Sequence, residues 1–210
     1  MKLATAAIIG LGLLLGGLAI ALYERSSASE IRGPSQGRFI GSETPAVITL
    51  PPFELRGYDG SLVRSSELLG KVVVLTFLDT KCREACPIIA GEVATAWRLL
   101  SRRERQQAVA VAISTDPRDD TPGNIRAFLR RHRALGTFRY LTGPIPEMKR
   151  LWHSFQILSS LESGDADTHS APVRIYSRDG VWLATQHAGA DLTPRNLAHD
   201  VRVALRESTP

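Results

Sequence analysis

The feature that most constrains the fold is a pair of uninterrupted apolar segments rich in small and β-branched residues, residues 72–78 (VVVLTFL) and 109–113 (VAVAI). Strands buried on both faces of a parallel sheet have this composition, because helices cover both of their faces. Between the two segments, apolar residues recur at helical spacing at Ile89, Val93, Trp97 and Leu100. The sequence therefore predicts a strand, a crossover helix and a second, parallel strand.

The rest of the chain extends this pattern into one α/β domain. Alternating residues on either side of Tyr58-Asp59-Gly60 predict a β-hairpin near the start, and Ser65–Gly70 is typical of a short capped helix. Further helices are expected at about 122–133, 146–155 and 193–206, and further strands at 138–141, 173–176 and 181–184. The order is hairpin, β-α-β-α-β-α-β-β-α. It predicts a thioredoxin-like fold, with a central mixed sheet flanked by helices and an N-terminal hairpin.

The N-terminal residues differ from the rest in composition. Residues 4–23 carry no charge, and such a helix spans about 30 Å, the thickness of the hydrocarbon core of a bilayer. We therefore expect a transmembrane anchor at residues 1–23, a flexible linker at 24–45 and the thioredoxin-like domain at 46–210. Lys2 precedes the apolar run, so the positive-inside rule predicts a single-pass protein of the cytoplasmic (inner) membrane, with its domain on the periplasmic, extracytoplasmic side. The alternative is a signal peptide cleaved near residues 27–29.

The formal net charge is +5, but the basic residues are scattered along the chain. Two clusters, residues 102–105 and 130–133, fall where helices are predicted to end, and cations there interact favourably with the helix dipole. A basic sequence indicates nucleic-acid binding only when the charge is concentrated on one surface. We therefore expect no nucleic-acid partner.

Two cysteines, Cys82 and Cys86, follow the first buried segment in a C-x3-C arrangement. A disulfide between them would close a very short loop and add little stability, so redox chemistry or metal binding explains the pair better. Thiolates are soft ligands that favour Cu(I), whereas a structural zinc site needs four protein ligands. Lys81, Arg83 and the amino end of the next helix are expected to lower the pKa of Cys82. Reactive thiols without a metal, or a structural pair, stay open at this point.

Five histidines could add a nitrogen ligand. Surface or packing roles are expected for four of them, His132, His153, His187 and His199, and His132 is expected to be solvated among arginines. His169 differs, because it lies in an irregular stretch just before the strand at residue 173, in a loop that faces the cysteine-bearing helix in a thioredoxin fold. A site of two sulfurs and this nitrogen would hold either Cu(I) or Cu(II).

Three segments together resemble the Sco/SenC family: DTKCREACP, STDPRDDTP and THSAPVRIYSRDG. The resemblance covers roughly residues 45 to 207. It implies a metallochaperone that binds one copper ion, Cu(I) or Cu(II), through Cys82, Cys86 and His169. The implied partner is subunit II of cytochrome c oxidase, whose binuclear copper site the protein would load or prepare. Other copper chaperones and thioredoxin-like reductants are further partners that it suggests.

Some residues depart from the family pattern without removing a ligand. Lys81, Arg83 and Glu84 replace its residues around the first cysteine, and Gln156 lies where a glycine is common. The alternative function is therefore a membrane-anchored thiol-disulfide oxidoreductase that acts without copper, with Cys82 and Cys86 as its catalytic redox pair. A disulfide-stabilised interaction module is a third possibility.

The acidic residues of STDPRDDTP, Asp116 and Asp120, have two interpretations. They could bind metal, or their side chains could accept hydrogen bonds from backbone amides in a turn before a helix that opens at Pro122. The second interpretation is favoured, because Asp and Ser commonly bond backbone groups in this way.

Overall fold

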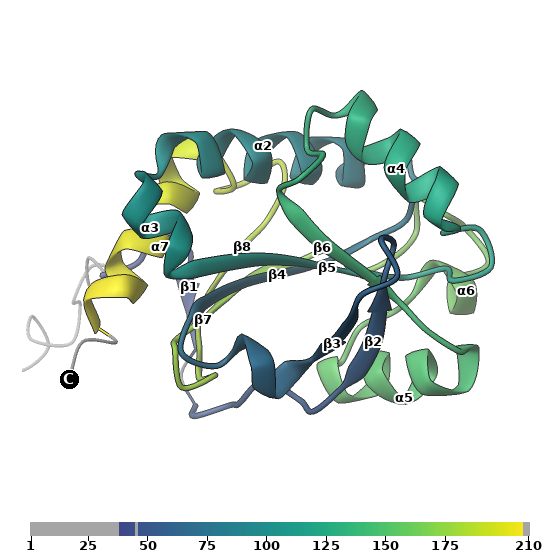
Figure 1. Cartoon of the computed structure of the whole chain (residues 1–210), viewed down its shortest axis with the longest axis horizontal. Helices are drawn as coiled ribbons and strands as arrows, with labels where there is room; N and C mark the ends of the chain where they lie inside the picture. Colours follow the sequence, from purple (N-terminus) through teal and green to yellow (C-terminus); the bar gives the residue numbers. More distant parts are fainter. Residues whose placement is uncertain (1–37, 45, 208–210) are drawn as a thin grey trace, which may run out of the picture. The chain divides into compact units, whose positions relative to one another are not determined.

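The computed structural model describes residues 38–44 and 46–207. In this part of the chain the strands form one sheet in the order β1-β8-β7-β4-β5-β6-β2-β3 (Figure 1). Their bounds are β1 Ser42–Glu43, β2 Glu54–Gly57, β3 Leu62–Arg64, β4 Val72–Leu78, β5 Ala108–Ser114, β6 Phe138–Thr142, β7 Val173–Tyr176 and β8 Trp182–Gln186.

The centre of the sheet is parallel and its flanks are antiparallel. Strands β4, β5 and β6 run parallel, whereas β7 pairs antiparallel with β4, and β2 pairs antiparallel with β6. Every residue of β4 and β5 is buried, as their apolar composition predicts. The predicted hairpin is β2–β3, in which Leu55 faces Val63. The mixed, thioredoxin-like sheet expected from the sequence is confirmed.

Helices cover both faces of this sheet (Figure 1). Their bounds are η1 Ser65–Leu68 (a 3-10 helix), α2 Ala85–Leu99, α3 Arg102–Gln106, α4 Pro122–Arg131, α5 Ile145–Phe155, α6 Ser160–Ser163 and α7 Pro194–Glu207. One apolar cluster joins α2, α4 and α7 to the sheet, and a second joins α5 and η1 to it. The sheet is therefore the middle layer of three.

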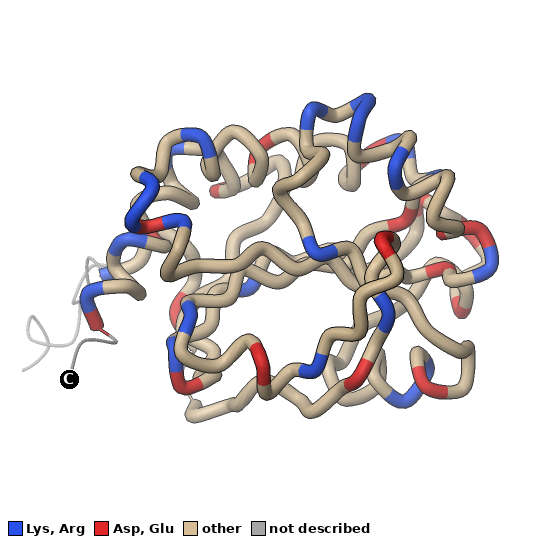
Figure 2. Tube along the Cα trace, viewed as in Figure 1, with Lys and Arg blue, Asp and Glu red and all other residues tan. Residues whose placement is uncertain are grey.

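Two short helices were not predicted. Residues 102–105 belong to α3, a separate short helix in which Ser101 and Glu104 form a capping box, and Arg103 and Arg105 lie in its last turn, at a helix end as predicted. Residues 158–169, expected to be irregular, contain α6, which Ser159 and Glu162 cap in the same way. Figure 2 shows lysines and arginines spread over helices and loops, with acidic residues among them.

The domain makes contacts upstream of residue 46. Phe39 is buried, and the N–H groups of Ile40 and Gly41 donate to the carboxylate of Asp200 at 2.8 and 2.9 Å. A side chain at Gly41 would meet the carbonyl oxygen of Thr185 at 2.6 Å, so this close approach requires glycine. The last residues of the predicted linker thus pack against α7 and β8.

The predicted anchor, residues 1–23, lies outside the described residues. Within 38–44 and 46–207, the structure contains no helix long and apolar enough to span a bilayer.

Candidate metal centre

Both cysteines lie where β4 ends and its crossover helix begins. Cys82 is in the connecting loop, and Cys86 is in the first turn of α2. Both are buried free thiols. The loop is folded back on itself, because the N–H of Cys82 donates to the carbonyl oxygen of Asp79 at 3.3 Å. This carboxyl edge of a central parallel strand is where open α/β proteins place their ligands.

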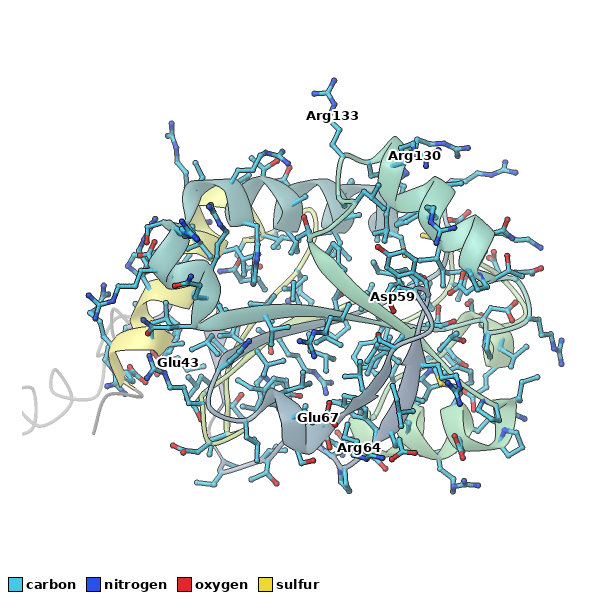
Figure 3. The ribbon with its side chains drawn as sticks, viewed as in Figure 1. Glu43, Asp59, Arg64, Glu67, Arg130 and Arg133 are labelled. Atoms are coloured by element: carbon cyan, nitrogen blue, oxygen red, sulfur yellow. The ribbon has the colours of Figure 1, made fainter. Side chains whose placement is uncertain are left out.

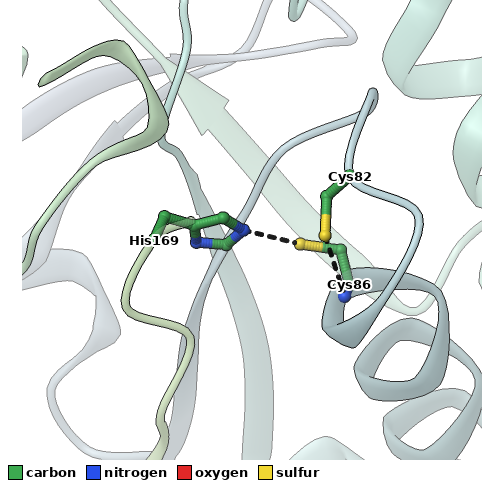
Figure 4. Close-up of side chains that lie close together, drawn as sticks. All are labelled: Cys82, Cys86 and His169. Carbon is green, nitrogen blue, oxygen red and sulfur yellow. Dashed lines mark hydrogen bonds between the residues drawn. The ribbon is translucent and has the colours of Figure 1, made fainter. Parts of the chain in front are cut away.

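His169 completes a compact cluster with the two sulfurs (Figure 4). Its Nε2 lies 3.2 Å from Sγ of Cys86, and one ligand atom from each of the three residues lies within 4.8 Å of the others. Sγ of Cys82 accepts the N–H of Cys86 at 3.4 Å, and Sγ of Cys86 accepts the N–H of Asp79 at 3.4 Å. Among the described residues this is the one such cluster suited to a metal ion. The structure therefore brings together the three residues named from the sequence.

The orientation of His169 is set by its own loop. Nδ1 lies 3.2 Å from the carbonyl oxygen of Ser170, so a proton on Nδ1 is donated there and Nε2 faces the sulfurs. Ser170 is held in turn by Leu158, because each backbone N–H of this pair donates to the other residue, at 2.9 and 3.1 Å. A loop fixed in this way presents a nitrogen ligand in one direction.

The two thiols differ in acidity. The hydrogen bond with Cys86 is the largest cause acting on Cys82; burial opposes it, and bonds with His169 and backbone amides add to it, so the pKa of Cys82 falls to about 5. Burial, together with the neighbouring Cys82, raises the pKa of Cys86 well above its ordinary value. At neutral pH the pair therefore holds one thiolate and one thiol, and binding a metal through both sulfurs would release a proton.

The pKa of the His169 imidazole is affected by the thiolate of Cys82. Burial disfavours the charged form of His169, but hydrogen bonds with Cys82 and the carbonyl of Ser170 outweigh burial, and the pKa of His169 is raised. The metal-free cluster thus stabilises positive charge on its nitrogen beside negative charge on its sulfur.

A buried carboxylate, Asp79, holds the cysteine loop in place through hydrogen bonds. Its Oδ1 accepts the N–H of Lys81 at 2.7 Å, and its Oδ2 accepts the hydroxyl of Ser160 at 2.6 Å. Ser160 belongs to α6, and its hydroxyl oxygen also lies 2.9 Å from the hydroxyl oxygen of Thr115, just after β5. Asp79 therefore joins the loop to two other elements. Sequence reasoning missed it, although an acidic residue directly after a buried strand was visible.

Asp120 supports the same loop from the neighbouring strand. Its Oδ1 accepts the N–H of Thr80 at 2.9 Å, and its Oδ2 accepts the hydroxyls of Ser114 and Tyr140 at 2.7 and 2.8 Å. Burial raises the pKa of Asp120 to about 6, against the lowering effect of these bonds. The expected turn role holds for Asp116, whose carboxylate accepts the N–H of Arg118 at 3.0 Å. Asp120 instead reaches across to the cysteine loop.

A third carboxylate, Asp167, connects the histidine loop to the cysteine loop. It accepts the N–H of Arg83 at 2.6 Å, and this bond is the first cause that lowers the pKa of Asp167. The only signal in the sequence was its place two residues before His169. The contact fixes the two ligand-bearing loops relative to each other.

Cations surround the approach to Cys82. A cavity of about 590 Å³ opens beside it, and Lys81, Arg83 and Arg131 line this cavity. The positive charge of Lys81 is partly neutralised, because its ammonium group pairs with the carboxylate of Asp119. The remaining cations give the entrance a positive character.

The other histidines do not join the cysteines in the described part of the chain. His153, His187 and His199 are exposed. His132 was expected to be solvated; it is instead half-buried, and its ring packs at a tilt of 56° against the ring of Phe128, with the centroids 4.6 Å apart.

Comparisons with known proteins agree on one family. The family model described as SCO1/SenC matches residues 41–206. A SCO2-like protein of Rickettsia prowazekii is 25% identical over 199 residues, which cover 92% of this chain and 93% of the relative.

Solved structures show the same fold. The copper-bound ScoI of Bradyrhizobium japonicum superposes with a TM-score of 0.63 at 24% identity, covering 74% of this chain and 98% of ScoI. BsSco is described as a member of the Sco family of cytochrome c oxidase assembly proteins with a disulfide switch. It gives a TM-score of 0.63 at 24% identity, covering 77% of this chain and 96% of BsSco.

Proposed function

The chain belongs to the SCO1/SenC family, and on this premise we propose that it is a copper chaperone that holds one copper ion through Cys82, Cys86 and His169. The observation that carries the proposal is the convergence of these three ligand atoms within 4.8 Å of one another, although His169 lies 83 residues after Cys86 in the sequence. The recipient we propose is the binuclear copper site of cytochrome c oxidase subunit II. Its support is the family, in which BsSco is described as a cytochrome c oxidase assembly protein.

The chemistry of the donors suits copper. Two sulfurs satisfy the preference of Cu(I) for soft ligands, and an imidazole nitrogen extends the set to Cu(II). Cys82 is already ionised at neutral pH, so a soft cation meets a prepared thiolate. His169 directs Nε2 at the sulfurs while Ser170 accepts from Nδ1, an outer contact of the kind that orients metal-bound imidazoles.

The test is copper binding by the purified full chain. Reduced protein loaded with excess copper and then desalted should retain one copper per chain by elemental analysis. Cys82→Ser and Cys86→Ser should each lose most of it. His169→Ala should weaken Cu(II) more than Cu(I), because two thiolates still hold the softer ion.

A matched control is His153→Ala, which removes an exposed histidine on α5 and should leave the stoichiometry unchanged. A copper content near zero in the reduced wild type would overturn the proposal. So would a loss in His153→Ala as large as that in His169→Ala.

The second candidate, thiol-disulfide exchange, is favoured by the unequal pKa values of the two thiols. The Cys82 thiolate would attack a partner disulfide, forming a mixed disulfide and releasing one partner thiolate. Cys86 would then lose its proton and displace the second partner sulfur, leaving a Cys82–Cys86 disulfide and a reduced partner. Electrons balance, because the partner gains the two that the cysteine pair loses.

Copper binding and the disulfide exclude each other, since the oxidised pair has no thiolate left. Copper titration of the reduced and the oxidised full chain therefore separates the two functions. Chaperone function requires tight binding by the dithiol and little by the disulfide. Equal binding by both forms would refute this exclusion. An absence of binding by either, with retained reduction of a model disulfide, would favour the oxidoreductase.

We also propose that residues 4–23 anchor the chain in the cytoplasmic membrane with residues 24–210 outside. The uncharged run after Lys2 supports this topology. Protease added to spheroplasts should remove the domain, whereas a protected soluble product would contradict the topology.

A further inference from the structure

A cavity separate from the metal centre lies beside β7 and β8. Its volume is about 640 Å³, within the range of small-molecule sites. Most of its wall is apolar, and the residues that matter here are Ala46, Ile48, Ile157, Pro172, Arg174 and Trp182. The cavity is close to the histidine loop, because Ser170 and Ala171 also line it. No residue proposed as a copper ligand lines it.

One wall carries a buried cation, Arg174 on β7, which is 8% exposed. Its guanidinium stacks on Trp182 at 4.3 Å from the ring centroid, and lies 6.0 Å from the rings of Phe77 and Phe155. Aromatic faces stabilise a cation in part but supply no acceptor for its N–H groups. Nε of Arg174 is buried and has no hydrogen-bond partner.

No ion pair balances Arg174 among the residues that the structure describes. Tyr176, two residues along the same strand, is a neutral hydrogen-bond partner: burial raises the pKa of Tyr176, and the charge of Arg174 and its hydrogen bond to Tyr176 lower that pKa in part. Glu43 lines the same cavity, but its carboxylate accepts the N–H of Phe39 at 3.3 Å. Arginine keeps its charge in proteins, and a buried charge is costly until a counter-charge reaches it.

We propose that this cavity binds a small organic acid, with the carboxylate on Arg174 and an apolar or aromatic body between Trp182 and the aliphatic wall. A guanidinium presents paired N–H donors that match a carboxylate in two parallel hydrogen bonds. A phosphate would bring a second charge and more acceptor atoms, whereas the wall holds no second arginine or lysine, and its one histidine, His187, is exposed. A single carboxylate on an apolar body therefore matches both features of the cavity. This site goes beyond the proposed copper function and does not depend on it.

The probe is para-(trifluoromethyl)phenylacetate, followed by fluorine NMR. The protein is the metal-free, reduced full chain in lipid nanodiscs, with empty nanodiscs as the blank. The wild type should show saturable binding, and the corresponding phenylacetamide, which lacks the charge, should bind more weakly. Arg174→Met should weaken carboxylate binding by about tenfold or more, the effect of losing hydrogen bonds to a charged group.

The matched control is Arg130→Met. Arg130 is exposed on α4, the helix that packs with α2 and α7, and points away from the domain (Figure 3). This variant should bind like the wild type. Should Arg174→Met fail to fold by circular dichroism, Ala46→Trp serves instead: Ala46 is exposed at the cavity, and a large ring there should block binding while keeping the cation.

Three results would overturn the proposal: no saturable binding by the wild type, equal binding of the acid and the amide, or undiminished binding in Arg174→Met and Ala46→Trp. Because no copper enters the experiment, its failure would leave the copper proposal untouched, and the reverse also holds.

Discussion

The loops that follow β4 and β5 start side by side, because Leu78 pairs with Ser114 at the ends of two parallel strands in register. The first, residues 79–84, continues into the helix that carries the second cysteine. The second, residues 115–121, carries no sulfur and no ligand of the cluster. Its buried carboxylate, Asp120, nevertheless accepts a bond from Thr80 in the first loop. One loop therefore supplies ligands, and its neighbour holds it in place.

This difference shows how a soft metal site can be kept ready without a metal. In the first loop the backbone N–H of Thr80 donates to Asp120 and that of Lys81 donates to Asp79. These two carboxylates hold the loop in its shape, and the sulfurs are not needed as acceptors for these two N–H groups. Ligands held by packed neighbours need little reorganisation when an ion arrives. The comparison predicts that the second loop matters more for stability and the first more for thiol chemistry.

The largest expected effect comes from removing the buried carboxylate of the second loop. Asp120→Ala would leave Thr80, Ser114 and Tyr140 without their shared acceptor, and unsatisfied buried groups cost about 1–3 kcal/mol each. We expect the free energy of unfolding to fall by about 4 kcal/mol, measured by urea denaturation near pH 5, where the folded carboxyl is protonated.

Asp116→Ala is the matched control in the same loop. Asp116 is half-buried and bonds only the local N–H of Arg118, so its removal should cost about 1 kcal/mol or less. Equal losses in the two variants would contradict the supporting role of Asp120.

The next effect is opposite pH dependence in the two loops. The pKa of Asp120 is raised from 3.8 to about 6, so its contribution to stability is complete below 3.8 and is lost as pH rises through 6. The pKa of Cys82 is lowered from 9.0 to about 5, so its contribution is present above 9.0 and is lost as pH falls through 5.

In metal-free, reduced protein, substitution of Asp120 or of Cys82 should each remove one part of the dependence of the free energy of unfolding on pH. Asp120→Asn should abolish a decline of about 3 kcal/mol between about pH 4 and 6. Cys82→Ser should abolish a rise between about pH 5 and 9, because it removes the thiol whose pKa is lowered in the folded protein. Free energies of unfolding measured across this range decide the matter; parallel profiles for wild type and both variants would refute the two pKa shifts.

The sequence predicted the sheet well because buried strands have a local pattern. Residues 72–78 and 109–113 were recognised from composition alone. The short helices α3 and α6 were missed, although their capping boxes are visible as Ser101-x-x-Glu104 and Ser159-x-x-Glu162. The departure at Gln156 has a structural correlate: it caps α5 with φ 54°, in the left-handed region that favours glycine.

The ligands of the candidate site could be predicted, but their supports could not. Cys82 and Cys86 share one motif, and His169 was placed by its position before a strand. The bonds from Asp120 to Thr80 and from Asp167 to Arg83 join residues 40 and 84 positions apart. Only the folded sheet brings such pairs together, and no local pattern reports them. The same is true of Arg174, whose charge within a strand gave no sign of the cavity beside it.

The smallest effect concerns the cations of the first loop and corrects an expectation from the sequence. Lys81 and Arg83 were expected to lower the pKa of Cys82, but the largest cause is the hydrogen bond with Cys86, and Lys81 pairs with Asp119.

Arg83→Gln keeps the backbone N–H that Asp167 accepts while removing an exposed, solvent-screened charge. It should raise the apparent pKa of Cys82 by about 0.3 or less, whereas Cys86→Ala should raise it by more than about one unit. The measurement is the rate of Cys82 alkylation against pH in metal-free protein, followed by mass spectrometry. A shift of a full unit in Arg83→Gln would show that the flanking cation, and not the second thiol, sets the acidity of the first loop.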